Sequence, residues 1–180
     1  MDDIAKELVM SKKTLYQYYE GKSDLIHKII EHYLSQEKDI VVDIQSISED
    51  AIDEMIRIAR YVIEFITNFN PSLSYDLKKY YPESWSIIEV GHMGFVKDTI
   101  TRNINRGKKE GVYRQEIITE IIASLYVSNS MNIALIQMPQ SEVVPSQIYR
   151  EMILYHLHGI MTEKGKKLFK INKTNTYAKV

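Results

Sequence analysis

The chain of 180 residues contains no cysteine, only four prolines and seven glycines. The lack of cysteine excludes a disulfide framework, a thiolate metal site and a cysteine nucleophile. Because proline and glycine are the main residues that interrupt helices, their scarcity favours long helices separated by short breaks. A hydrophobic content of 44% over this length is sufficient for a sizeable core.

Long apolar runs are also missing, since no segment approaches the roughly 18 residues that a membrane span requires. Asp2 and Asp3 stand where a secretion signal would carry positive charge. We therefore expect a cytoplasmic protein that has no membrane partner.

The net charge is −1, so the overall balance does not indicate a nucleic-acid partner. The distribution is uneven, because residues 161–180 carry six lysines against one acidic residue, Glu163. Such a basic segment is either a solvated helix end, which the helix dipole favours, or a phosphate-binding arm. We prefer the first interpretation because runs of like charge are commonly solvated tails.

Motifs of enzymes and metalloproteins are absent. His27 and His32 are five residues apart, and His156 and His158 are two apart, so neither spacing stacks two ligands on one helical face. The sequence has no glycine-rich phosphate loop, nucleophile elbow or His-Glu metal motif. We therefore expect no catalytic residues, no metal and no cofactor.

Apolar residues recur with the 3.6-residue period of helices, and signals for strands are nearly absent. The chain is therefore predicted to be all-α. Ser48 is the expected N-cap of one helix, which should end at Asn70. The other long helices are predicted over residues 24–43, 84–109, 116–137 and 145–167, with one short helix over residues 72–80.

The most informative segment begins at Asp2, where a short amphipathic helix is followed by a turn at residues 9–11. Ser11 is a good N-cap for a second short helix over residues 12–19. Two short helices joined by a tight turn are typical of a helix-turn-helix.

On the second helix, Leu15 and Tyr19 lie one turn apart and are expected to face a core. The remaining positions carry polar, short or aromatic side chains, of which an amide such as Gln17 can pair with adenine. Lysine, threonine and tyrosine side chains commonly contact phosphate oxygens.

The string SKKTLYQYY at residues 11–19, followed by GKSDL at 21–25, resembles the recognition helix and following turn of bacterial TetR-family transcriptional regulators. Residues 106–114 are similar to the turn that joins the seventh and eighth helices of that family. The resemblance implies an N-terminal DNA-binding part followed by a helical ligand-binding and dimerisation bundle. The predicted division is residues 1–43, 44–167 and, for a basic C-terminal tail, 168–180.

The resemblance further implies that Lys13 and Gln17 face the major groove and that Leu15 and Tyr19 belong to the core. The complete set of DNA-binding residues is expected to be Ser11, Lys12, Lys13, Thr14, Tyr16, Gln17, Tyr18 and Lys22. Members of the family have another helix before the helix-turn-helix, whereas Met1 here stands directly before the second helix. We therefore expect a truncated start.

Thirteen tyrosines, one tryptophan and eight methionines are many for this length, and such side chains suit an adaptable apolar pocket. The resemblance places a pocket among the central helices. Its expected lining is Tyr61, Phe65, Tyr80, Trp85, His92, Asn129 and Asn132. Ordinary core packing is the alternative for each of these residues.

The last two long helices carry apolar faces that a monomer would expose, and the family dimerises through this region as a four-helix bundle. The expected interface residues are Ile121, Leu125, Met152, Tyr155, His156 and Gly159. A dimer would present two recognition helices to successive major grooves, about 34 Å apart.

Together these patterns predict a ligand-responsive transcriptional regulator, in the commoner case a repressor, which binds a palindromic double-stranded DNA operator as a homodimer. A small, largely apolar effector would release it by shifting the helix that begins at Lys22. The alternative is a helical dimeric module that binds a ligand or a protein without DNA. An enzyme is the third interpretation.

Overall fold

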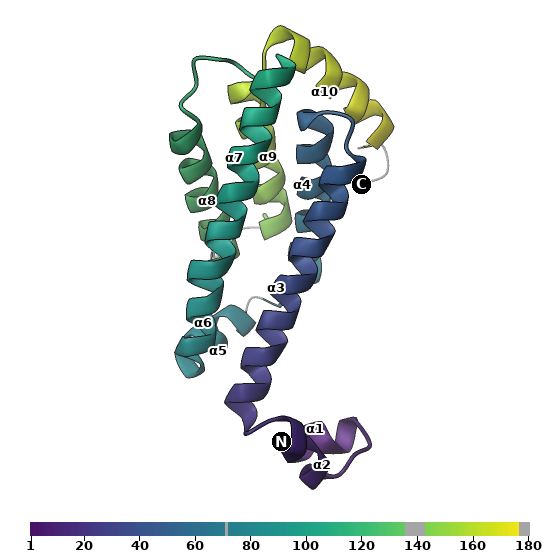
Figure 1. Ribbon diagram of the computed structural model, residues 1–180, viewed down its shortest axis with the longest axis vertical. Coiled ribbons are helices and arrows are strands. Elements are labelled where there is room, and N and C mark those ends of the chain that lie inside the picture. The colour runs from purple at the N-terminus through teal and green to yellow at the C-terminus, as the bar shows by residue number, and fades with distance from the viewer. Residues whose placement is uncertain (71, 136–142, 177–180) are drawn as a thin grey trace.

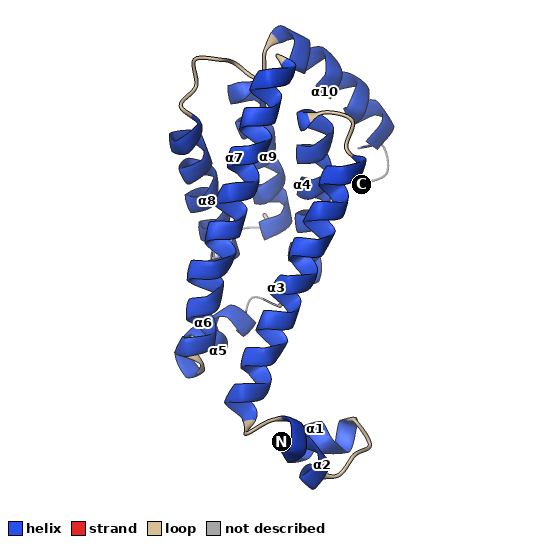
Figure 2. Cartoon of the chain, viewed as in Figure 1, coloured by secondary structure: helices blue, strands red, loops and turns tan. Residues whose placement is uncertain are grey.

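The computed structural model describes residues 1–70, 72–135 and 143–176, which contain helices and no strand (Figures 1 and 2). The all-α fold predicted from the sequence is confirmed. The described helices are α1 (Asp2–Glu7), α2 (Lys12–Tyr18), α3 (Lys22–Ile47), α4 (Ala51–Asn68), α5 (Ser72–Tyr80), α6 (Pro82–Ile87), the π-helix η1 (Ile88–His92), α7 (Met93–Glu110), α8 (Thr119–Leu135), α9 (Pro145–Ile160) and α10 (Glu163–Thr176).

The helix α3 links two parts of the molecule. It has 26 residues and is therefore about 39 Å long at 1.5 Å per residue. The helices α1 and α2 lie beyond one end of α3, whereas α4, α7, α8 and α9 form a bundle beside its other end (Figure 1). The pair α5 and α6 packs along the part of α3 nearer α1 and α2.

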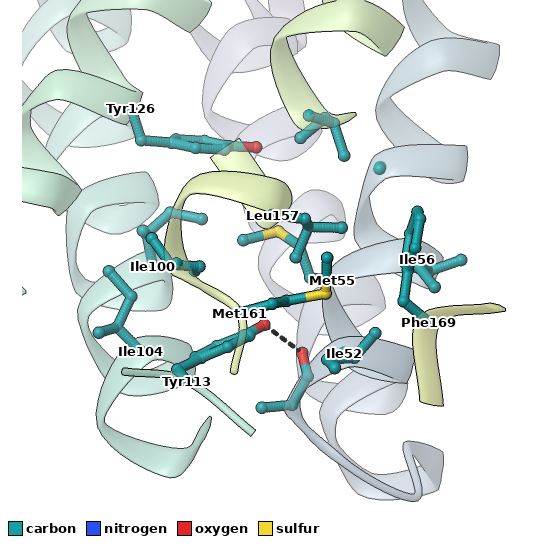
Figure 3. Close-up of a cluster of buried hydrophobic side chains, with 14 of the residues drawn as sticks. Ile52, Met55, Ile56, Ile100, Ile104, Tyr113, Tyr126, Leu157, Met161 and Phe169 are labelled. Carbon is teal, nitrogen blue, oxygen red and sulfur yellow. Dashed lines mark hydrogen bonds between the residues drawn. The ribbon is translucent and has the colours of Figure 1, made fainter. Parts of the chain in front are cut away.

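The main core lies inside this bundle, and its helices bury the apolar faces that the sequence pattern predicts. At its centre the Tyr113 hydroxyl donates to the carbonyl of Ala51 at 3.0 Å (Figure 3). The Asn103 side-chain amide donates to the same carbonyl at 2.8 Å. Because these buried polar groups are paired, they fix the start of α4 against α7 without a desolvation penalty.

The predicted N-cap at Ser48 is wrong. The carboxylate of Asp50 accepts hydrogen bonds from the backbone amides of Ile52 and Asp53, at 2.8 and 2.9 Å, and so caps α4. Ser48 instead ends the preceding helix, because its hydroxyl donates to the carbonyl of Ile44.

The single helix predicted from Pro145 to about residue 167 is also wrong. The chain leaves the helical conformation at Met161, which forms a bridge with Tyr113. The hydroxyl of Thr162 then accepts from the amide of Gly165, and this bond begins α10. Since α10 continues to Thr176 and buries Phe169 beside Ile56, the basic segment expected as a tail is helical through that residue (Figure 3).

The close contact between Gly107 and Tyr113 provides a test of this packing. A Cβ atom at Gly107 would overlap the buried ring of Tyr113, whereas one at Gly94 on the same helix would meet nothing within 4 Å. Gly107→Ala is expected to lower the free energy of unfolding by about 2 to 3 kcal/mol through overpacking. Gly94→Ala should raise it by about 0.5 to 1 kcal/mol.

Urea unfolding of both variants, monitored by circular dichroism, measures the two free energies. Equal effects of the two alanines would contradict the packing described at Tyr113.

Candidate nucleic-acid interface and ligand cavity

The N-cap and the buried face of the short helix α2 agree with the sequence prediction. The Ser11 hydroxyl accepts from the amide of Thr14 at 3.0 Å, which confirms Ser11 as the N-cap. Leu15 is buried and Tyr19 is half-buried, and Ala5 of α1 is buried as well. Val9 turns the chain between the helices with a positive φ of 53°, a left-handed conformation that is costly for a β-branched residue.

The outer face of α2 presents groups that can read DNA. Exposed side chains from the expected DNA-binding set are Ser11, Lys12, Lys13, Tyr16, Gln17, Tyr18 and Lys22. Thr14 is half-buried, and its hydroxyl contacts that of Ser11 at 2.7 Å. This exposed set therefore combines three lysines, an amide and two phenols, the groups that contact base edges and phosphates.

Two of these lysines already have intramolecular neighbours. The ammonium of Lys12 lies 2.7 Å from the carboxylate of Asp2 in an exposed ion pair. Lys22 lies over the ring of Tyr81, 6.0 Å from its centroid. Exposed pairs of this kind are weak, so either lysine can exchange its partner for a phosphate at little cost.

The sequence analysis missed the contacts that orient α2 on α3. The carboxylate of Asp24 accepts from the backbone amide of Glu20 at 2.9 Å and from the ammonium of Lys28 at 3.0 Å. Lys28 also donates to the carbonyl of Tyr18. The Glu20 amide, followed by Lys28, lowers the pKa of Asp24. An Asp–Lys pair four residues apart is the signal that could have revealed this junction.

The expected ligand-binding residues are dispersed. Tyr61 and Phe65 are half-buried on α4, where the Phe65 ring lies 5.4 Å from that of Tyr33. Trp85 is buried on α6, while Tyr80 and Asn129 are exposed. The side chain of Asn132 lies outside the described residues. The described members of this set thus lie on several different helices.

His92, the remaining expected ligand residue, does line a cavity. This cavity of about 260 Å³ lies between α3 and the segment from α6 through η1 into α7. Its lining consists of Glu31, Leu34, Ser35, Glu37, Lys38, Ile87, Gly91, His92 and Phe95. The helix that carries α1 and α2 thus forms one wall of the cavity.

A π-helix shapes the opposite wall. The sequence predicts one continuous helix from Ser84 to Lys109, but Ile88–His92 adopts π-helical hydrogen bonding within it. Both Gly91 and His92 lie on this segment and line the cavity. Local π-helices are rare and frequently occur at functional sites.

The outer face of α8 and α9 carries an exposed apolar strip. Ile121 and Leu125 are more than half exposed on α8, and the sequence analysis missed Ile118, which continues this strip. Tyr155 of α9 is 83% exposed. Gly159 is exposed as well.

Two other expected interface residues lie at the edge of this strip. Met152 is half-buried. His156 turns inward, with its ring 5.1 Å from that of Tyr126, and burial lowers its pKa to about 4. His156 therefore packs between α8 and α9 within one chain.

The chain is a helical protein in two parts. A helix-turn-helix lies at one end of a long helix, and a helical bundle with a cavity lies at the other end.

No protein-family model matches the chain. YvaF, an HTH-type transcriptional regulator of Bacillus subtilis (strain 168), is 28% identical over 99 residues, which are 54% of this chain and 50% of YvaF. The chain thus spans about half the length of this curated relative.

Solved structures of bacterial regulators share the fold. A TetR-family regulator from Agrobacterium tumefaciens superimposes with a TM-score of 0.71 at 14% identity, over 89% of this chain and 86% of that one. NemR of E. coli in its reduced form gives 0.68 at 13% identity, over 90% and 86%. A transcriptional regulator from Saccharomonospora viridis in complex with choline gives 0.70 at 16% identity, over 90% and 86%. The chain therefore has the TetR fold, and the resemblance predicted from the sequence is confirmed at this level.

Within the described residues, no helix combines the length and apolar character needed to cross a membrane. The same residues contain no group of three or more His, Asp or Glu placed to hold a metal ion.

The junction between α2 and α3 can be tested by exchange of backbone amides. In Asp24→Asn the neutral amide cannot hold Lys28 by charge, so α2 should open more often. We expect amide exchange over residues 12–20 to accelerate about fivefold or more, with α4 and α7 unchanged. Hydrogen exchange read by mass spectrometry measures this effect.

The exposed Asp3 of α1 provides the matched control, since Asp3→Asn makes the same change in charge outside the junction. If both variants exchange as the wild type does, Asp24 does not position α2.

Proposed function

We propose that this chain is a ligand-responsive transcriptional regulator of the TetR type. It binds a palindromic operator as a homodimer, acts as a repressor, and is released by a small effector with a largely apolar body. The observation that carries the proposal is the exposed polar face of α2, joined by the hydrogen bond from Lys28 to the Tyr18 carbonyl to a helix that lines the cavity. The relatives named above are transcriptional regulators, which supports this function over an enzymatic one.

In this proposal residues 1–43 form the DNA-binding part with its connecting helix. Lys13 and Gln17 enter the major groove, and the hydroxyls and lysines around them hold phosphates. Residues 44–167 bind the effector and the second protomer, while the C-terminal segment 168–180 takes no part in DNA binding. Since an amide pairs bidentately with adenine, Gln17 contributes sequence preference as well as affinity.

The proposed dimer forms through the exposed apolar strip of α8 and α9. Ile121 and Leu125 meet their counterparts across a two-fold axis, with Tyr155 at the side. The exposed Gly159 permits a close approach of helices, whereas Met152 and His156 support the interface from beneath. This arrangement hides apolar surface that a monomer leaves in water.

Effector binding in the cavity changes the position of α3, because α3 is one wall of the cavity and carries the DNA-reading helix. A coupling free energy of about 1 to 3 kcal/mol between the two sites changes operator affinity five- to 150-fold. That a structural neighbour binds choline supports a small organic effector for this fold.

Selection from a pool of random DNA duplexes, at two salt concentrations, tests the DNA-binding function. We expect a palindrome to be enriched and affinity to fall steeply with salt, because phosphate contacts release counterions. Gln17→Ala should cost about 1 to 3 kcal/mol and relax the preference at one base position, whereas Lys13→Ala should weaken all sequences. Lys97→Ala, on the exposed side of α7, is the control.

If no duplex is enriched at either salt concentration, the regulator proposal fails. The alternative, a dimeric module that binds a ligand or protein without DNA, would then be favoured.

The dimer is tested by placing a charge on the apolar strip. Leu125→Arg should convert the dimer to a monomer at micromolar concentration, since an unpaired charge would be buried in the interface. Leu73→Arg, at a similarly exposed position of α5, should leave the dimer intact. Analytical ultracentrifugation distinguishes the two species, and a dimer that persists in Leu125→Arg would place the interface elsewhere.

A further inference from the structure

The cavity between α3 and η1 has a mixed lining whose chemistry restricts its ligand. Leu34, Ile87 and Phe95 provide apolar surface for the body of a small molecule. Four other lining residues are titratable, namely Glu31, Glu37, Lys38 and His92. Two of the four are carboxylates, and Lys38 is the one ammonium among the lining residues.

Of the two glutamates that line the cavity, Glu31 is exposed, whereas only 12% of the Glu37 side chain is exposed. Its Oε2 lies 2.9 Å from Nδ1 of His92, but the ring nitrogen lacks the alignment of a hydrogen bond. Glu37 is thus a mostly buried carboxylate whose contact with η1 is poorly aligned, and an ammonium in the cavity can offer it a better-aligned donor.

The hydroxyls near Glu37 are consistent with a negative centre at this point. Burial raises the pKa of Tyr33, and the nearby Tyr61 hydroxyl and Glu37 carboxylate raise it further. The pKa of Tyr61 is also raised, by burial first and by Glu37 as well. Both phenols therefore stay protonated and uncharged, and the carboxylate is left as the charged group of this region.

Lys38 does not neutralise the same point. Its side chain is exposed, and its ammonium lies 5.9 Å from the centroid of the Phe95 ring. Because Lys38 already lies over Phe95, an ammonium that enters the cavity is directed to Glu37 rather than to the face of this ring.

We propose that the cavity binds a small organic cation, an ammonium group on an apolar or aromatic body, with the ammonium at Glu37 and the body against Leu34, Ile87 and Phe95. The inference rests on the proposed function, because it names the chemical class of that regulator's effector. An ammonium at Glu37 takes the place of the poorly aligned contact with His92. The ligand thereby acts on the contact between α3 and η1.

Isothermal titration calorimetry of the whole chain, without DNA, tests this inference with three probes of nearly equal shape. Benzylammonium, benzyl alcohol and benzoate differ mainly in charge. We expect benzylammonium to bind at least tenfold more tightly than benzyl alcohol and benzoate to give no heat of binding. Equal affinity for the alcohol, tighter binding of benzoate, or no binding by any of the three overturns the proposal.

The position of the cation is tested by Glu37→Gln, which should abolish the preference for benzylammonium over benzyl alcohol. Affinity for the alcohol reports that the cavity is intact in this variant. Glu89→Gln is the matched control, since Glu89 lies exposed on η1 outside the lining. A preference that survives in Glu37→Gln overturns the assignment.

These outcomes are separate from those of the DNA selection. Binding of benzylammonium without any enriched duplex would refute only the regulator, whereas an enriched palindrome with no bound probe would refute only the cationic effector.

Discussion

The arrangement of the two parts depends on the ion-pair network at the end of α3 farthest from the helix-turn-helix. The guanidinium of Arg106 donates to Glu54 at 2.8 Å, to Glu110 at 2.7 Å and to the carbonyl of Ser48 at 2.9 Å. Glu110 in turn accepts from the amide of Ala51 at 2.8 Å. Because Glu54 is buried, loss of its partner would leave an uncompensated charge inside the protein, at a cost of about 3 to 5 kcal/mol.

This network fixes the C-terminal end of α3. The contacts of α3 nearer its N-terminal end therefore determine the orientation of α2. Val41 is buried near the fixed end, whereas the part of α3 from Glu31 to Lys38 faces the cavity. A helix of 26 residues converts a small tilt at the cavity into a larger displacement at its far end. The junction then couples α2 to this displacement, since Lys28 of α3 donates to the carbonyl of Tyr18 at the end of α2 and Asp24 accepts from the amide of Glu20 in the link between the two helices.

Local signals were sufficient to predict the helix-turn-helix, because Ser11 caps α2 through an amide three residues away and Leu15 is buried by helical spacing. The break between α9 and α10 could not be predicted in this way. It requires Met161 to pair with Tyr113 and the amide of Thr162 to donate to Val112, contacts between segments about 50 residues apart. Sequence periodicity continues through residue 161 and carries no sign of that pairing.

The same limit applies to the side chains that line the cavity between α3 and η1. The abundance of aromatic residues indicated an apolar pocket, but Tyr113, Tyr126 and Trp85 are buried by packing against neighbouring side chains. Glu31 and Glu37 look like the solvated face of an amphipathic helix, and only the approach of η1, more than 50 residues later, turns them toward a cavity. Since charge in a cavity discriminates between ligands more strongly than apolar area does, the tertiary approach of these two segments, rather than composition, determines which charged groups line this cavity.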